Sequence, residues 1–301
     1  MTRSPLPRGA RSALALIVAL ALAACATHIN RPAARSTAAP DRFTYSVDVQ
    51  RRYTPPDWPE TLYADLYRPE APGARPAVLL VHGGGWEGGE PDDMRGIAER
   101  LAEAGFVVMN VAYRLAPAYR FPAPLHDLQA AVRWLRTHAG ELGVDSARIA
   151  GFGYSAGAHL VALLALAPAT PALDAPHGGP DTRLQAVVAG GTPTDLRKFD
   201  GGRLVPQFLG GTQAEVADRY ALASPAVHVT PEAPPFFLYH GGSDLLVSVD
   251  HAEDLFERLQ AAGVPAEFFR MHLRGHIAAF LTDGTALERA IGFLDRTLPH
   301  R

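Results

Sequence analysis

The sequence has little cysteine, no marked excess of charge and no long apolar run. One cysteine among 301 residues excludes a disulfide-stapled fold and a metal site built from several thiolates. A formal net charge of −3 offers no basic face for nucleic acid. A membrane-spanning helix needs about 20 apolar residues, and no run is that long. With 48% hydrophobic residues, the chain has enough apolar material for one globular domain with a full core.

The first 24 residues have the organisation of a signal peptide, with three arginines in Met1–Ser12 and an apolar run over Ala13–Leu22. The run ends in the letters LAAC at residues 22–25, which resemble the bacterial lipobox. That resemblance implies cleavage before Cys25 and acylation of its thiol and new amine, which anchors a protein stably. The alternative is an ordinary secretory peptide. We expect the lipoprotein, because the chain's one cysteine falls at the position that the lipobox requires.

Residues 25–40 are rich in Ala, Arg, Pro and Thr and have no hydrophobic period. This composition predicts a flexible tether between the anchor and a domain over residues 41–301. We therefore expect the protein to be lipid-anchored at the inner or outer membrane of the bacterial envelope. Without acylation it would be periplasmic or secreted.

Residues 41–301 alternate between strand and helix patterns. Phe43–Val49 and Leu62–Arg68 alternate apolar and polar residues, as antiparallel strands with one buried face do. Continuous apolar runs, typical of parallel strands covered on both faces, occupy Ala77–Val81, Phe106–Val111, Ile149–Phe152, Ala186–Ala189, Phe236–Tyr239 and Ala266–Met271. Helical patterns occupy Asp92–Ala104, Leu125–Ala139, Ala156–Ala167, Val249–Ala262 and Leu287–Thr297. The sequence predicts one α/β domain with an eight-stranded, mostly parallel sheet and helices on both faces.

The strongest chemical motif is GYSAG at residues 153–157, between a predicted buried strand and an apolar helix. In this context the pattern G-x-S-x-G places a serine on a sharp, strained turn at the carboxyl end of a sheet. Small residues must flank that serine at a distance of two, as Gly153 and Gly157 do. The motif predicts that Ser155 is a nucleophile, against the alternative of a glycine-rich turn with an incidental serine.

A second glycine-rich segment, HGGGW at residues 82–86, follows the strand over Val78–Val81. Backbone amides in such a loop form an oxyanion hole together with the amide of the residue after the nucleophile. The sequence therefore predicts an oxyanion hole made by the amides of Gly84, Gly85 and Ala156. A phosphate-binding loop is the alternative, but neither the P-loop nor the G-x-G-x-x-G spacing is present.

Chain order selects the base and the acid, because an acid and then a histidine follow the serine in enzymes with such a turn. Three histidines follow predicted strands in that part of the chain, at positions 240, 272 and 276. We expect His276 to be the base, since it follows the last strand and Gly275 frees its loop. We expect Asp244 to be the acid that orients it, with Asp250, at the start of a helix, as the alternative.

These motifs in this order, with YRLAP at residues 113–117, resemble the α/β-hydrolase superfamily over roughly residues 62–298. Within it, the chain is similar to hormone-sensitive-lipase-like carboxylesterases and to bifunctional feruloyl and acetyl-xylan esterases. The resemblance implies the α/β-hydrolase fold and an acyl-serine mechanism on carboxylic esters, without a metal or cofactor. Two departures from the hormone-sensitive-lipase relatives are Tyr154, where they have an acid, and the absence of a helical N-terminal cap.

The segment over residues 197–233 has two interpretations: a small lid over the serine, or a connection with its own small core. A lid of this size favours short acyl groups, on carbohydrate-linked or aryl esters. An aryl formamidase would use the same residues on an amide substrate. The alternative outside the enzymes is a non-catalytic binding module of the bacterial envelope. The expected partners are a small ester and, through lipidated Cys25, a membrane, with no nucleic acid.

Overall fold

The structure is a computed structural model that describes residues 26–32 and 42–299. Within them one sheet has the strand order β1-β9-β8-β7-β6-β4-β5-β3-β2. The strands are β1 Ala26–Ile29, β2 Tyr45–Arg52, β3 Tyr63–Pro69, β4 Arg75–Val81, β5 Val107–Val111, β6 Val144–Tyr154, β7 Ala186–Gly190, β8 Phe236–Gly241 and β9 Ala266–Met271. The strands from β4 to β9 pair parallel with one another, whereas β1, β2 and β3 pair antiparallel with their neighbours.

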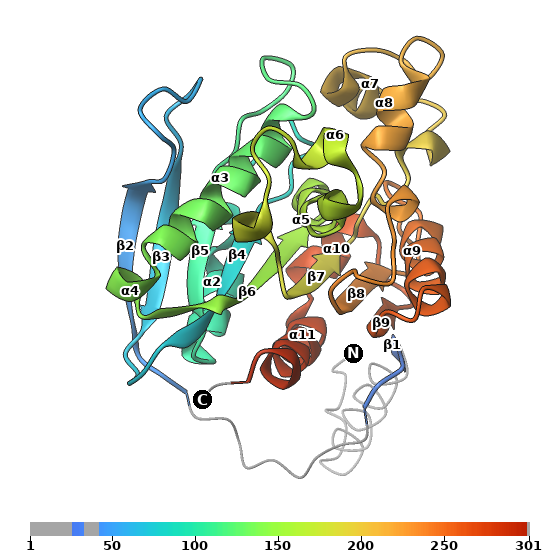
Figure 1. Ribbon diagram of the computed structural model, residues 1–301. Helices are drawn as coiled ribbons and strands as arrows, with labels where there is room; N and C mark the ends of the chain where they lie inside the picture. Colours follow the sequence, from blue (N-terminus) through green and yellow to red (C-terminus); the bar gives the residue numbers. More distant parts are fainter. Residues whose placement is uncertain (1–25, 33–41, 300–301) are drawn as a thin grey trace, which may run out of the picture.

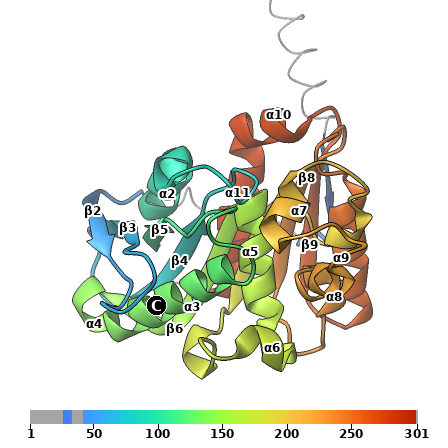
Figure 2. The ribbon, with the colours of Figure 1, turned by 90° about the horizontal axis from the view of Figure 1, so that it is seen from above.

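Helices cover both faces of this sheet (Figures 1 and 2). They are α2 Arg95–Glu103, α3 Ala123–Thr137, α4 Ala139–Leu142, α5 Ala156–Leu166, α6 Pro171–Asp174, α7 Leu204–Leu209, α8 Ala217–Leu222, α9 Asp250–Ala261, α10 His276–Leu281 and α11 Gly284–Thr297. The side chains of α3, α5 and α9 belong to one buried cluster, and those of α2 and α11 to the other.

Strand β4 shows why the central strands read as continuous apolar runs. Leu79 and Val81 point into the cluster beneath α3 and α5, whereas Val78 and Leu80 point into the cluster beneath α2 and α11. All four are fully buried, because successive side chains of a strand alternate between faces and both faces are covered here. The mostly parallel sheet with helices on both faces, predicted from the sequence, is confirmed.

The sheet has one strand more than the eight expected. Strand β1 lies within residues 25–40, which the sequence predicted to be a tether, and pairs antiparallel with β9. His28 Nε2 lies 2.9 Å from Glu267, and the Asn30 amide donates to the Ala266 carbonyl at 3.1 Å. Four residues are too short to show a period, and the strand depends on the free edge of β9, so the prediction of a tether is wrong for Ala26–Ile29. The predicted signal peptide, Cys25 and residues 33–41 lie outside the described residues.

No helix among the described residues is long and apolar enough to cross a membrane. Among residues 26–32 and 42–299, no group of three or more His, Cys, Asp or Glu side chains could hold a metal ion.

A buried ion pair joins the segment after β5 to α3. Asp127 has a fully buried side chain and accepts hydrogen bonds from the Arg114 amide at 2.9 Å and the Arg114 guanidinium at 2.8 Å. It also accepts one from Trp58 Nε1 at 2.7 Å. The pair fixes the YRLAP segment in place against α3. This motif therefore has a structural role in the domain.

Replacing this carboxylate should be costly, because Asp127→Ala leaves the Arg114 guanidinium buried without its counter-charge. We expect a loss of about 3–5 kcal/mol in the free energy of unfolding, measured by urea denaturation. The control is Asp92→Ala, which removes the exposed pair with Arg95 and should lower the free energy of unfolding far less. Equal losses in the two variants would show that the buried pair has no special role.

Candidate active site

The candidate site lies at the carboxyl ends of the parallel strands. The HGGGW segment follows β4, Ser155 follows β6, Asp244 follows β8 and His276 follows β9. Parallel strands deliver the segments that follow them to the same edge of a sheet, which is where ligands bind in such folds. Residues that are far apart in sequence therefore meet at this edge.

Ser155 has a strained backbone, with φ 53° and ψ −121°, at the turn between β6 and α5. A non-glycine residue at positive φ is costly, at about 1–3 kcal/mol, and such strain is typical of functional sites. The surroundings are as tight as the sequence predicted. A Cβ atom on Gly153 would lie 2.4 Å from the Gly157 carbonyl carbon, and one on Gly157 would lie 2.2 Å from the Val81 oxygen. Only glycine fits at both positions.

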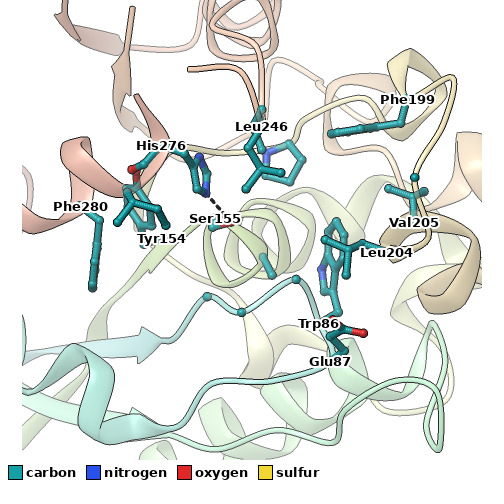
Figure 3. A pocket seen from close by; sticks show the side chains of 18 of the residues that line it. Trp86, Glu87, Tyr154, Ser155, Phe199, Leu204, Val205, Leu246, His276 and Phe280 are labelled. Carbon is teal, nitrogen blue, oxygen red and sulfur yellow. Dashed lines mark hydrogen bonds between the residues drawn. The ribbon is translucent and has the colours of Figure 1, made fainter. Parts of the chain in front are cut away.

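The three residues predicted from chain order come together here. His276 Nε2 lies 2.8 Å from Ser155 Oγ, and His276 Nδ1 lies 2.6 Å from Asp244 Oδ2. Figure 3 shows the imidazole above the serine at the wall of a cavity. With Nδ1–H donating to the carboxylate, Nε2 carries the lone pair that can accept the serine proton. The hydroxyl, the imidazole and the carboxylate form one hydrogen-bonded chain.

Asp244 is held as a carboxylate. Its Oδ1 accepts the amides of Leu246 and Val247, each at 2.9 Å, and its Oδ2 lies 3.3 Å from Nε2 of His240. Burial by itself would raise the pKa of Asp244. Hydrogen bonds from His240, His276 and Val247 outweigh burial and hold the pKa well below its usual range. The site therefore keeps the negative charge that stabilises an imidazolium.

The other two candidate histidines have different surroundings. His240 is fully buried, and its Nε2 also lies 2.8 Å from the Val247 carbonyl. It therefore helps to hold the loop that carries Asp244. His272 lies 2.5 Å from Thr27 Oγ1 of β1. Asp250, the alternative acid, pairs with Lys198 at 2.9 Å at the start of α9.

Tyr154 is a positioning residue that the motif alone did not reveal. Its hydroxyl donates to the His276 carbonyl at 2.5 Å, and the two ring centroids are 5.2 Å apart. Burial raises the pKa of Tyr154 well above its usual range, so the hydroxyl keeps its proton and remains a donor. This is the position at which the sequence departs from the hormone-sensitive-lipase relatives.

The loop after β4 is shaped by positive φ angles at Gly84 (100°), Gly85 (61°) and Trp86 (62°). A Cβ atom on Gly84 would lie 2.2 Å from the Gly88 carbonyl oxygen, so that turn needs a glycine. Gly84 and Gly85 line the same cavity as Ser155 and Ala156. The predicted oxyanion residues thus face one space, and their role as donors stays a prediction.

His82, at the start of this loop, has a structural role. Its Nδ1 lies 2.8 Å from the Gly83 carbonyl, and its ring stacks on Tyr113 with centroids 4.3 Å apart. The Tyr113 hydroxyl donates in turn to the carbonyls of His82 and Gly83. His82 and Tyr113 therefore brace the loop.

A second buried network fixes Trp86. Its Nε1–H donates to His159 Nδ1 at 3.2 Å, and His159 Nε2 lies 2.7 Å from the Ala223 carbonyl. Burial lowers the pKa of His159 to about 4, so the ring is neutral, with Nδ1 as acceptor and Nε2–H as donor. The network joins the glycine loop to α5 and to the segment over residues 197–233.

The cavity has a volume of about 550 Å³ and mostly apolar walls (Figure 3). Phe199, Leu204 and Val205 of the 197–233 segment form part of its wall. Phe208 of α7 is fully buried and stacks on Trp86 with centroids 4.7 Å apart. The segment thus has a packed core of its own and also faces the cavity.

Two polar contacts and one aromatic contact tie this segment to neighbouring elements. Glu87 of the glycine loop pairs with Arg203 and accepts a hydrogen bond from Gln207 at 2.7 Å. Phe121, before α3, packs on Phe208 with ring centroids 5.8 Å apart.

Comparison with solved structures identifies the fold as that of the α/β-hydrolases. A truncated carbohydrate esterase from gut microbiota has a TM-score of 0.76 at 22% identity, covering 87% of this chain and 99% of that one. A butyrate-bound esterase, Est2 of Thermogutta terrifontis, has a TM-score of 0.72 at 26% identity, covering 85% of this chain and 96% of that one.

The sequence comparisons define the family. The BD-FAE family model matches residues 64–259, and the chain belongs to that family. The chain is 30% identical to the probable carboxylic ester hydrolase LipM of Mycobacterium tuberculosis over 229 residues, which are 73% of this chain and 53% of LipM. The chain spans about half the length of the curated relatives that it matches. The resemblance stated from the motifs is confirmed at the level of family and fold.

The site predicts unequal roles for its two candidate acids. Asp244→Asn should lower kcat/KM for an ester substrate by up to about 10⁴-fold, the loss that the corresponding change causes in a serine protease, because the tautomer of His276 is no longer fixed. Asp250→Asn, the matched control, should retain activity within about twofold, since it alters only an exposed pair with Lys198. Equal activity of the two variants would contradict the assignment of the acid.

Proposed function

We propose that this protein is a serine hydrolase that cleaves carboxylic esters through an acyl-serine intermediate. The observation that carries the proposal is the continuous hydrogen-bonded chain from Ser155 Oγ through His276 to Asp244 at the wall of an apolar cavity. The strained turn holds the hydroxyl where a substrate in the cavity can reach it. The esterase names of its relatives support the same reaction.

The reaction follows from the geometry. Ser155 Oγ attacks the ester carbonyl carbon as His276 Nε2 takes its proton, and the carbonyl oxygen becomes an oxyanion. The amides of Gly84, Gly85 and Ala156 stabilise that oxyanion. His276 then protonates the leaving alkoxide as the C–O bond breaks, which leaves the acyl group on Ser155. Water, deprotonated by His276, attacks the acyl-enzyme and releases the acid and the free serine.

Ser155→Ala tests this proposal, because it removes one hydroxyl and no packed group. Hydrolysis of p-nitrophenyl acetate should be abolished, with the melting temperature within a few degrees of wild type. A fluorophosphonate probe should label wild-type protein at Ser155 and leave the variant unlabelled. Hydrolysis by the variant at the wild-type rate would disprove the nucleophile. Absence of labelling in folded wild-type protein would instead favour a non-catalytic binding module.

We propose that the substrates carry short acyl groups on a carbohydrate or aryl alcohol. The cavity of about 550 Å³ is closed on one side by Phe199, Leu204 and Val205, and Arg203 fastens that segment to Glu87. The Thermogutta esterase has been solved with butyrate and with propionate, which are short acyl products. A carbohydrate esterase among the structural neighbours supports the sugar-linked class of alcohol.

Chain-length dependence tests the acyl preference. Acetyl and butyryl p-nitrophenyl esters should be hydrolysed at least about tenfold faster than the decanoyl ester, because we expect the small 197–233 segment to enclose only a short acyl chain. The measurement is kcat/KM for the three esters. Faster turnover of the decanoate would disprove the preference. A parallel panel of acetylated sugars, feruloyl esters and N-formyl aromatics identifies the alcohol, and a preference for the formyl amides would assign an aryl formamidase.

We propose further that the protein is anchored at the bacterial envelope through lipid on Cys25, as the lipobox-like sequence predicts. Cells given an alkyne analogue of palmitate should incorporate it into wild-type protein and not into Cys25→Ser, as shown by fluorescence after click coupling. The matched control is Ser12→Ala, which leaves the lipobox intact and should be labelled like wild type. Equal incorporation into wild type and Cys25→Ser would disprove the anchor.

A further inference from the structure

Large apolar side chains are exposed around the mouth of the cavity. Five of the ten such side chains that the described residues expose lie in three short segments at the carboxyl edge of β8 and β9. We call them the apolar rim: Leu245 (99% exposed), Leu246 (55%), Leu273 (78%), Ile277 (62%) and Leu281 (72%). Leu246 and Ile277 also line the cavity, so the rim continues directly from its wall. An exposed cluster of this kind marks a surface that binds something apolar.

The charge of the rim restricts what that partner is. Residues 271–282 contain no acidic side chain and one arginine, Arg274. The one acid in residues 241–248 is Asp244, which is buried in the site. The ranges 241–248 and 271–282, which contain the whole rim, therefore present apolar groups and a cation, without an exposed carboxylate. That combination suits the headgroups and acyl chains of an anionic phospholipid surface.

The path of the chain places the N-terminal strand at the same edge. Strand β1 begins with Ala26 opposite Met271, the last residue of β9, and Thr27 Oγ1 lies 2.5 Å from His272 Nε2. Figure 2 shows β1 beside β9 on the side of the molecule where α10 lies. The first described residue, Ala26, is therefore at the carboxyl end of β9, the strand that Leu273 follows, and Cys25 precedes it in the sequence.

We propose that the apolar rim rests on the surface of a phospholipid bilayer, with the mouth of the cavity facing the lipid. The inference rests on the proposed anchor at Cys25, which would hold the rim against the membrane. Because β1 is hydrogen-bonded into the sheet, the domain is attached at a fixed edge and its orientation is defined. Esters that partition into the lipid surface then reach Ser155 without leaving it.

Membrane contact is measured at two positions on the full-length protein. Leu273→Cys on the rim and Val49→Cys on β2, at the far edge of the sheet, each add one thiol for a nitrobenzoxadiazole label. Both side chains are well exposed in the wild-type structure. The labelled proteins are reconstituted in vesicles of phosphatidylethanolamine and phosphatidylglycerol that contain lipids spin-labelled on the acyl chain. Quenching at position 273 should exceed that at position 49 by at least about twofold.

Three results would overturn the proposal. Weak quenching at both positions would show that the domain stands away from the bilayer, and equal strong quenching would show that no face is preferred. In detergent, protection of the thiol at position 273 from labelling, together with cross-linking of two chains through that thiol, would show that a second copy covers the rim.

A separate control distinguishes failure of the anchor from failure of the rim. Wild-type protein with acylated Cys25 takes up no thiol label, whereas labelling of wild type would show that the anchor proposal has failed. The rim is then tested by flotation of the full-length chain with the same vesicles. Leu273→Ser with Leu281→Ser should lower the bound fraction about tenfold, and Val47→Ser with Val49→Ser should leave it unchanged. Equal binding of the two double variants to the vesicles would disprove the role of the rim.

Activity on a soluble ester verifies that the rim variants remain folded. Leu273 and Leu281 do not line the cavity, so the Leu273→Ser, Leu281→Ser protein should hydrolyse p-nitrophenyl acetate like wild type. The same protein should hydrolyse an ester dissolved in the vesicles at least about threefold more slowly than wild type, because fewer molecules reach the lipid surface correctly oriented. An unchanged rate on the vesicle-borne ester would contradict the proposal.

Discussion

The chemistry depends on one hydrogen bond, between Ser155 Oγ and His276 Nε2, across 121 residues of sequence. Ser155 and His276 follow β6 and β9, and the parallel register of β6, β7, β8 and β9 brings the carboxyl ends of these strands to one edge of the sheet. Through Gly190 and Tyr239, the last residue of β6 is level with Phe269, two residues before the end of β9. Burial of apolar side chains on both faces keeps the register fixed. The packing of the core is therefore the first condition of the proposed reaction.

Around that contact, hydrogen-bonded polar groups fix each loop. Two backbone amides and two histidines surround Asp244, Tyr154 supports the backbone of His276, and His159 connects Trp86 to Ala223. Buried polar groups without partners would cost about 1–3 kcal/mol each, so these contacts also specify one arrangement of the loops. The precision of the site thus depends also on buried residues behind the cavity wall, such as His159 and His240.

The same edge of the sheet combines the candidate active site, the apolar rim and the start of β1. An anchored hydrolase with this arrangement would meet substrates at a lipid surface, which unites the acyl-serine chemistry with the envelope location proposed from the N-terminal sequence. In the two proposals the apolar cavity selects the acyl group and the apolar rim orients the domain.

The sequence by itself determined the class of fold and the identity of Ser155, Asp244 and His276, because continuous apolar strands, a glycine-flanked serine and chain order are local signals. It did not predict β1 or the positioning roles of Tyr154, His159 and His240. Strand β1 forms only where β9 offers a free edge, Tyr154 and His159 act through contacts with residues distant in sequence, and His240 acts through the fold of the loop after β8. Such contacts exist only after the chain has packed, so the tertiary structure alone decided them.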